Sequence, residues 1–142
     1  MRQARAGYLH HGIPFNRLGH GPRPLIVFQG LTFENKPQSV LATRMYNFLG
    51  QDYTVYSVLR KPALPCGYTL QDMTNDYATM IGEQFGGPVD VIGISTGGSI
   101  AQHFAGDHAH LVRRLVIHSS ACRLSDAAKA TQMETGRLAS QR

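Results

Sequence analysis

One short motif could place a reactive hydroxyl at a sharp turn. Residues 93–97 read Gly-Ile-Ser-Thr-Gly, which matches the pattern G-x-S-x-G around Ser95. The motif directly follows an apolar run and precedes a segment of helical periodicity, so the serine has a strand-turn-helix setting. A serine on such a turn projects its hydroxyl above the sheet, and the N-terminus of the helix favours developing negative charge. This arrangement suits nucleophilic attack on an acyl group.

The residues around Ser95 are small, as a strained turn requires. Gly93 and Gly97 stand two positions away on either side, where a larger side chain would collide with the helix or a neighbouring strand. We therefore predict that Ser95 is a nucleophile and that Gly93 and Gly97 are the glycines of its elbow. A glycine-rich turn with an incidental serine is the alternative that the motif alone leaves open.

Four apolar runs predict strands buried on both faces, as in a parallel sheet. They occupy residues 25–28, 53–59, 89–94 and 115–117. Segments of helical periodicity lie between them, and a further helix is expected from Ser125. The expected buried stripes are Leu41, Met45, Phe48 and Leu49 in the first helix, Met73, Tyr77, Met80, Ile81 and Phe85 in the second, and Ile100, Ala101, Phe104 and Ala105 in the third. Strands that alternate with helices predict an α/β fold with a mostly parallel sheet and helices on both faces.

The motif and its setting make the chain resemble the first half of the α/β-hydrolase superfamily, through the nucleophile elbow and the following strand. Three other segments support the resemblance by their order and spacing, at residues 19–24, 65–73 and 113–120. The resemblance implies one partial, C-terminally incomplete domain over residues 1–142. Within it we expect an N-terminal hairpin at 7–18, a core at 25–120 and the start of a cap helix at 125–140.

The resemblance also implies an oxyanion hole made of two backbone amides, those of Leu31 and Thr96. Many members of the superfamily have His-Gly where this chain has Gln29-Gly30. Because the contact is made by a backbone amide, glutamine can be tolerated there, whereas Gly30 lets the chain approach the oxyanion closely. An ordinary strand-to-helix connection is the alternative for this loop.

A serine nucleophile needs a base and an acid that orients the base. In the superfamily both follow the nucleophile, and this chain ends before their usual positions. His118 and Asp126 are weak candidates for these roles, and the other three histidines downstream of Ser95 are expected on the surface: His103, His108 and His110. We therefore expect a truncated form of a longer enzyme, whose last strand is an open edge through which the chain could self-associate.

Composition excludes several other classes of protein. The formal net charge is +5, but the basic residues are scattered and no aromatic residues interleave with them, so we expect no nucleic-acid partner. No apolar stretch has the length of a membrane span, and the N-terminus lacks the apolar region of a secretory signal. Cys66 and Cys122 are too few and too far apart for a metal site, so we expect free thiols, no metal and a cytoplasmic location.

The leading hypothesis is a serine hydrolase of small-molecule esters or similar acyl substrates that acts through Ser95 without a cofactor. A non-catalytic α/β-hydrolase-like protein that binds a ligand or a partner chain is the alternative. A dinucleotide-binding domain fits the alternation of strands and helices, but the chain lacks G-x-G-x-x-G after its first strand.

Overall fold

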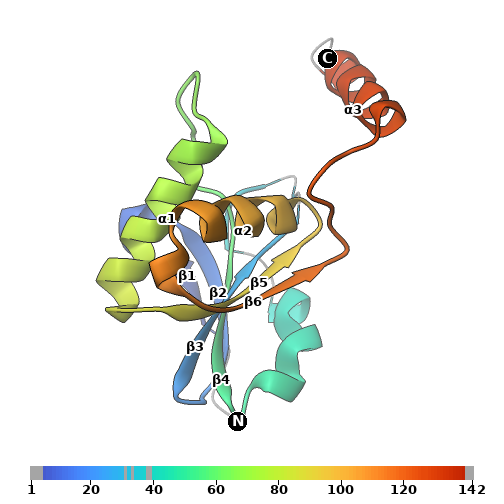
Figure 1. Cartoon of the computed structure of the whole chain (residues 1–142). Coiled ribbons are helices and arrows are strands. Elements are labelled where there is room, and N and C mark those ends of the chain that lie inside the picture. Colours follow the sequence, from blue (N-terminus) through green and yellow to red (C-terminus); the bar gives the residue numbers. More distant parts are fainter. Residues whose placement is uncertain (1–4, 31, 33, 38–39, 140–142) are drawn as a thin grey trace.

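The structure of the chain is a computed structural model that describes residues 5–30, 32, 34–37 and 40–139. Within these residues one sheet has the strand order β1-β2-β4-β3-β5-β6 (Figure 1). Its strands are β1 (Arg5–Tyr8), β2 (Pro14–Gly19), β3 (Arg23–Phe28), β4 (Tyr53–Val58), β5 (Val89–Ile94) and β6 (Val112–His118). The pairs β4–β3, β3–β5 and β5–β6 are parallel, whereas β1–β2 and β2–β4 are antiparallel. The sheet is therefore mostly parallel, as the sequence predicts.

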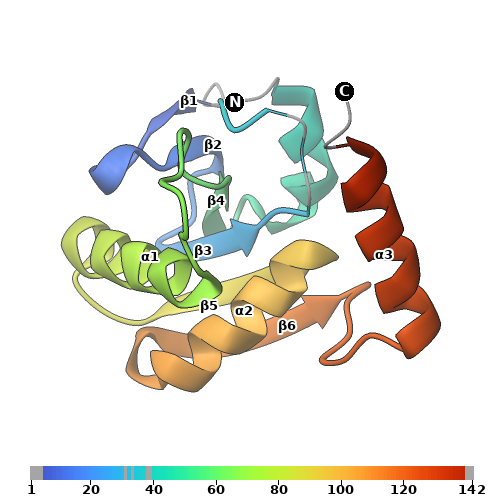
Figure 2. The ribbon, with the colours of Figure 1, turned by 90° about the horizontal axis from the view of Figure 1, so that it is seen from above.

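Helices cover both faces of the sheet. In the described residues they are α1 (Leu70–Phe85), α2 (Thr96–Asp107), α3 (Asp126–Ala139) and the 3₁₀ helices η1 (His10–Gly12), η2 (Val40–Leu49) and η3 (Ala109–Leu111). Figure 2 shows α1 and α2 on one face and η2 on the other. The reason is topological: the chain steps from β3 to β4 in one direction and then from β4 past β3 to β5 and β6 in the other. Right-handed crossovers in opposite directions place their helices on opposite faces.

The central strand β3 contributes to two separate cores. Ile26 and Phe28 point to the α1 and α2 face, whereas Leu25 and Val27 pack on the η2 face. All four side chains are buried, which explains why the segment reads as a continuous apolar run and does not alternate with polar residues. The predicted stripes of α1 and α2 are confirmed except at the half-buried Ala105, which is not part of this core. The residues in or against the first core are Met73, Tyr77, Met80, Ile81, Phe85, Ile100, Ala101 and Phe104.

The predicted stripe of the helix at 40–49 is wrong in part. Met45 and Phe48 are 63% and 78% exposed, and Tyr46 is buried against the sheet together with the half-buried Leu49. The cause is the helix type, because η2 is a 3₁₀ helix with three residues per turn. Residues three apart share a face of such a helix, so Tyr46 and Leu49 face the core and Met45 and Phe48 face away from it. The side chain of Leu41 lies outside the described residues.

Local capping interactions define both ends of α1. The Thr69 hydroxyl accepts a hydrogen bond from the Asp72 amide, and the Asp72 carboxylate accepts one from the Thr69 amide, which together form a capping box. At the other end Gly86 adopts a left-handed conformation with φ 69°. Glu83, near that end, accepts hydrogen bonds from His10 and His11 and so links the N-terminal strands to α1.

The last two elements are the least covered part of the described chain. β6 is the last strand of the sheet order, and its apolar Leu115 and Val116 are 38% and 54% exposed. Beyond it, the Ser125 hydroxyl accepts a hydrogen bond from the Ala128 amide and caps α3, as the sequence predicts. Figure 1 shows α3 standing apart from the sheet.

A nearly buried carboxylate ties β5 to β6 at their amino ends. The Oδ1 atom of Asp90 lies 2.8 Å from Nε of Arg113, and the Asp90 side chain is only 5% exposed. Burial raises the pKa of Asp90, but the hydrogen bond from Arg113, the Tyr53 hydroxyl and the positive charges of the two arginines outweigh that effect and leave the pKa below its ordinary value. The ionised form is therefore favoured in the folded protein.

We predict that Asp90→Asn lowers the free energy of unfolding by about 1–3 kcal/mol at pH 7, because Arg113 loses a charged partner. The folded pKa is lowered, so the contribution of Asp90 is complete above its unfolded pKa and is lost as pH falls through the folded value. Urea unfolding at pH 7 and near pH 3 measures both effects. A difference between wild type and Asp90→Asn that stays constant down to pH 3 would contradict the assignment.

Candidate active site

The reversal of strand order creates a natural place for a site. The loops after β3 and β5 leave adjacent parallel strands at the same edge of the sheet, and the chain turns away from them toward opposite faces. In open α/β sheets, ligands bind outside the carboxyl ends of the strands at such a switch point. Gly30 follows β3 and Ser95 follows β5, so the two loops singled out from the sequence meet here.

Ser95 lies between the end of β5 and the first residue of α2 with φ 53° and ψ −123°. A residue other than glycine rarely adopts a positive φ, and such strain persists only when the surrounding structure enforces it. Two backbone hydrogen bonds do so: the Ser95 amide donates to the His118 carbonyl at 3.0 Å, and the Ser95 carbonyl accepts from the Gly98 amide at 2.9 Å. The residue itself is exposed.

The glycines around Ser95 are required by close backbone contacts. A Cβ atom at Gly93 would lie 2.5 Å from Cβ of Ala101 and 2.7 Å from Cα of Gly98. A Cβ atom at Gly97 would collide with the carbonyl oxygen of Phe28. The start of α2 therefore rests directly on the ends of β3 and β5, and a side chain at Gly93 or Gly97 would separate them.

The loop after β3 lies against the Ser95 side chain. A Cβ atom at Gly30 would be 3.3 Å from Cβ and 3.8 Å from Oγ of Ser95, so the backbone of Gly30 is close to the hydroxyl. Leu31, whose amide the resemblance assigns to the oxyanion hole, lies outside the described residues. Thr96 opens α2, and the first four amides of a helix have no partner within it.

Gln29 takes a structural part in this loop. Its side-chain amide donates to Oγ of Ser57 at 2.6 Å, which anchors the start of the loop to β4. Its own backbone amide donates to the carbonyl of Val58. Gln29 thus holds the start of the loop by its side chain and its backbone, next to the approach of Gly30 to Ser95.

Arg60 also belongs to this region, and sequence reasoning did not single it out. It follows β4, and its guanidinium donates to the Gly30 carbonyl at 3.3 Å and to Oγ1 of Thr96 at 3.0 Å. A basic residue after a strand has no motif of its own, and only the strand order brings it over the end of β3.

The candidates for acid and base stay predictions. His118 is joined to Ser95 through their backbones, and among the described residues neither side chain has a hydrogen bond with the other. Its register partner on β5 is Ile94, so its exposed side chain is on the η2 face of the sheet. Asp126 is 96% exposed at the start of α3 and lies 3.6 Å from Lys129.

The three other histidines lie toward the far end of α2 from Ser95 or beyond it. His103 is paired with Asp107 at 2.7 Å, and His108 contacts Asn75 at 3.1 Å and packs against Phe104. His110 is exposed in η3. These contacts and exposures place the three histidines at the surface of the helical layer, away from Ser95.

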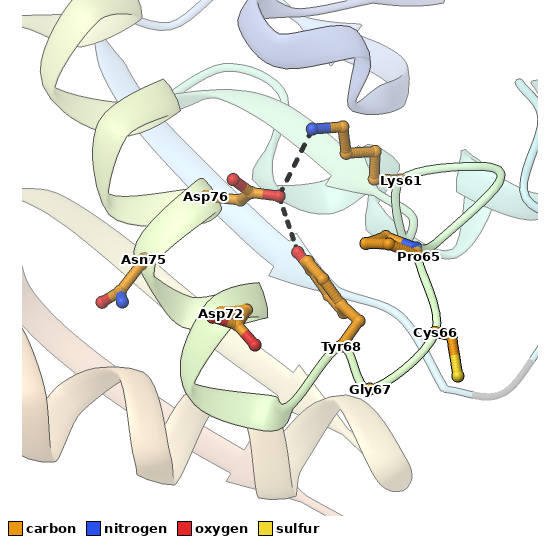
Figure 3. Close-up of a pocket in the computed structure, with 8 residues that line it drawn as sticks. All are labelled: Lys61, Pro65, Cys66, Gly67, Tyr68, Asp72, Asn75 and Asp76. Carbon is orange, nitrogen blue, oxygen red and sulfur yellow. Dashed lines mark hydrogen bonds and ion pairs between the residues drawn. The ribbon is translucent and has the colours of Figure 1, made fainter.

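A polar surface pocket of about 400 Å³ opens beside the start of α1, in the segment expected to precede the nucleophile strand. Figure 3 shows that Lys61 and Tyr68 both point toward Asp76, whereas Cys66 points away from this group. The Tyr68 hydroxyl donates to Asp76 at 2.6 Å, and the Lys61 ammonium lies 3.6 Å from the same oxygen. Burial and the Asp76 carboxylate raise the pKa of Tyr68. These groups satisfy one another and fasten the 61–69 loop to α1.

Neither a metal centre nor a membrane span is found in the part of the chain that the structure describes. No three His, Cys, Asp or Glu side chains gather there in a way that could hold a metal ion. None of the helices there has the length and apolar character needed to cross a bilayer. Cys66 and Cys122 are free and exposed.

The fold of this chain was compared with those of known proteins. No protein-family model and no curated protein matches the sequence. Among solved structures, Rv0554 from Mycobacterium tuberculosis superposes on 98% of this chain with TM-score 0.73 and 19% identity. An alpha/beta hydrolase from Sphaerobacter thermophilus covers 96% with TM-score 0.69 and 20% identity. A marine microorganism esterase covers 90% with TM-score 0.68 and 24% identity.

The chain has the α/β-hydrolase fold. It spans 53%, 55% and 51% of the lengths of these three structures, so it represents about half of each. The α/β-hydrolase fold is thus shared over nearly the whole of this chain.

We predict that Gly97→Ala destabilises the fold by about 1–3 kcal/mol, because the added methyl group meets a strand backbone that has no room to move. The matched control is Gly82→Ala in α1, where no atom lies within 4 Å of the added Cβ. A helix gains about 0.5–1 kcal/mol when alanine replaces glycine, so this control should become more stable. Urea unfolding measures both, and equal midpoints for wild type and Gly97→Ala would show that α2 does not rest on β3 as described.

Proposed function

We propose that the chain carries the nucleophile of a serine hydrolase that acts on small-molecule esters or similar acyl substrates. The observation that supports this most directly is the strained Ser95, held at φ 53° between β5 and α2 with its side chain exposed beside Gly30. Strain of this kind at an exposed serine has no evident value for stability, and it presents the hydroxyl to a ligand at the edge of the sheet.

In the proposed reaction Ser95 Oγ loses its proton to a base as it bonds to the substrate carbonyl carbon. The carbonyl oxygen becomes an oxyanion, which the amides at the start of α2 and in the loop after β3 stabilise. The tetrahedral intermediate collapses, the bond to the alcohol breaks, and the alcohol takes the proton from the base. Water then attacks the acyl-enzyme by the same route, which releases the acid and restores the serine. The reaction needs no cofactor.

The base and its orienting acid are the parts of this proposal that the described residues leave open. Because the similar structures are about twice as long, we propose that both groups come from sequence beyond residue 142. His118 and Asp126 are retained as weak candidates. The 142-residue chain alone should then turn over substrate slowly or not at all.

The alternative is a non-catalytic relative that binds a ligand or a partner chain. It is favoured by the lack of a described side chain in hydrogen-bond contact with Ser95 Oγ. Since the two hypotheses differ in whether Ser95 can be activated, a covalent probe separates them.

A cytoplasmic location is also proposed, since two exposed free cysteines suit a reducing compartment.

We predict that a fluorophosphonate probe labels Ser95 slowly and that added imidazole, acting as a substitute base, accelerates the labelling. Ser95→Ala should abolish it. Ser99→Ala removes an exposed hydroxyl one helical turn further along α2, and this control should label like wild type. Mass spectrometry of the modified peptide gives the site and the rate. Folded wild type that stays unlabelled with imidazole would favour the non-catalytic alternative.

Within the described residues the outer edge of β6 and the apolar Leu115 and Val116 are uncovered, so we also propose that the 142-residue chain by itself associates through pairing of β6 with a second copy. Val116→Lys should reduce the association, since a charge on an edge strand opposes pairing. Met133→Lys, on the exposed α3, is the control and should leave it unchanged. Sedimentation velocity over a range of concentrations measures the effect, and a wild type that stays monomeric would contradict the proposal.

A further inference from the structure

Arg60 joins the two loops that flank Ser95. The sheet order β4-β3-β5 places the end of β3 between Arg60 and α2, so the side chain must cross the end of β3 to reach Thr96. On the way its Nη1 atom donates to the Gly30 carbonyl at 3.3 Å, and its Nη2 atom ends 3.0 Å from Oγ1 of Thr96. One planar guanidinium thus holds a backbone carbonyl of one loop and a side chain of the other.

The charge of Arg60 is not neutralised by a described carboxylate. Its neighbour Lys61 is paired with Asp76, and Arg113 is paired with Asp90. Arg60, by contrast, is half-buried and has no ion pair among the residues that the structure describes. Placing a half-buried cation where the described residues offer no counter-ion costs free energy, so its contacts with the two loops beside Ser95 point to a role at that site.

Both residues that accept hydrogen bonds from Arg60 lie next to Ser95. Gly30 is the residue whose backbone lies against the Ser95 side chain, and a hydrogen bond to its carbonyl fixes the plane of the peptide that contains it. Thr96 is the first residue of α2, and the first amides of a helix lack the usual partner within it. The bond to its hydroxyl keeps the helix start at a constant distance from the β3 loop. A site for an oxyanion depends on such fixed donors, because a small displacement weakens them.

We propose that Arg60 is a positioning residue for the oxyanion site. It holds the loop after β3 against the first residue of α2, and its positive charge, which no carboxylate among the described residues neutralises, favours negative charge on a substrate oxygen bound between them. This inference rests on the proposed function of Ser95, but the bridge itself does not, so the two can fail separately.

The test compares imidazole-assisted labelling of Ser95 in wild type, Arg60→Met, Arg60→Lys and Thr96→Val, with each rate corrected for the folded fraction. Arg60→Met should label about tenfold more slowly or worse, since it removes both bonds and the charge. Arg60→Lys should recover part of the loss, because it restores the charge but not the planar fork. Thr96→Val, which removes one acceptor and keeps the charge, should fall between wild type and Arg60→Met.

The matched control is Arg23→Met, which removes the same charge at the opposite end of β3, where Arg23 packs on Tyr53 and lies 3.9 Å from Asp52. It should label within about twofold of wild type, since that end of the sheet is remote from the oxyanion site. A labelling rate for Arg60→Met equal to that of wild type would overturn the inference, even where the variant is less stable.

A second measurement applies if wild type does not label at all, which would be a failure of the proposed function. Amide hydrogen exchange of Ser95→Ala, with and without Arg60→Met, reports on the bridge without any chemistry at Ser95. Peptides that cover Gly30 and Thr96 should exchange about tenfold faster once Arg60 is lost, while the middle of α1 keeps its protection. Unchanged exchange in both peptides would show that Arg60 does not hold the two loops together.

Discussion

The contact between the backbone of α2 and the ends of β3 and β5 is the constraint on which the rest of the site depends. Gly93 and Gly97 have no side chains, so the helix start can lie directly on the strands. That closeness leaves too little room for a relaxed turn, and the chain enters α2 through the positive φ of Ser95. The exposed position of the hydroxyl is therefore a product of packing and not of the serine itself.

The same closeness explains why the surrounding loops have so little freedom. The loop after β3 passes beside the Ser95 side chain, where a Cβ at Gly30 would make a tight contact of 3.3 Å. It is fastened from one side by the bond of Gln29 to Ser57 and from the other by Arg60. One fastening residue, Ser57, lies in β4, the strand next to β3, and the other, Arg60, comes shortly after it. The strand order thus determines which residues can stabilise the loop.

Much of this arrangement could be predicted from the sequence because it depends on local patterns. The apolar runs of the strands and the stripes of α1 and α2 follow from periodicity, and the Ser95 turn follows from a motif in its proper setting. The exposure of Phe48 could not be foreseen, because a 3₁₀ helix and an α-helix differ in which positions share a face. Arg60 and the pair Asp90–Arg113 could not be foreseen either, since each contact joins residues on different strands and depends on strand order and register.

The pairing of β6 with β5 contains an irregularity at Val89 and Asp90, after which Asp90 faces Arg114 and Ile94 faces His118. Strands have a side-chain period of two, so a slip of one residue would exchange the faces of Leu115 and Val116. It would also withdraw the His118 carbonyl from the Ser95 amide, the bond that helps to hold the strained turn. The bulge near the start of β6 therefore determines which residue of β6 lies beside the end of β5. The backbone conformation of the proposed nucleophile thus depends in part on the number of residues in a strand that comes later in the chain.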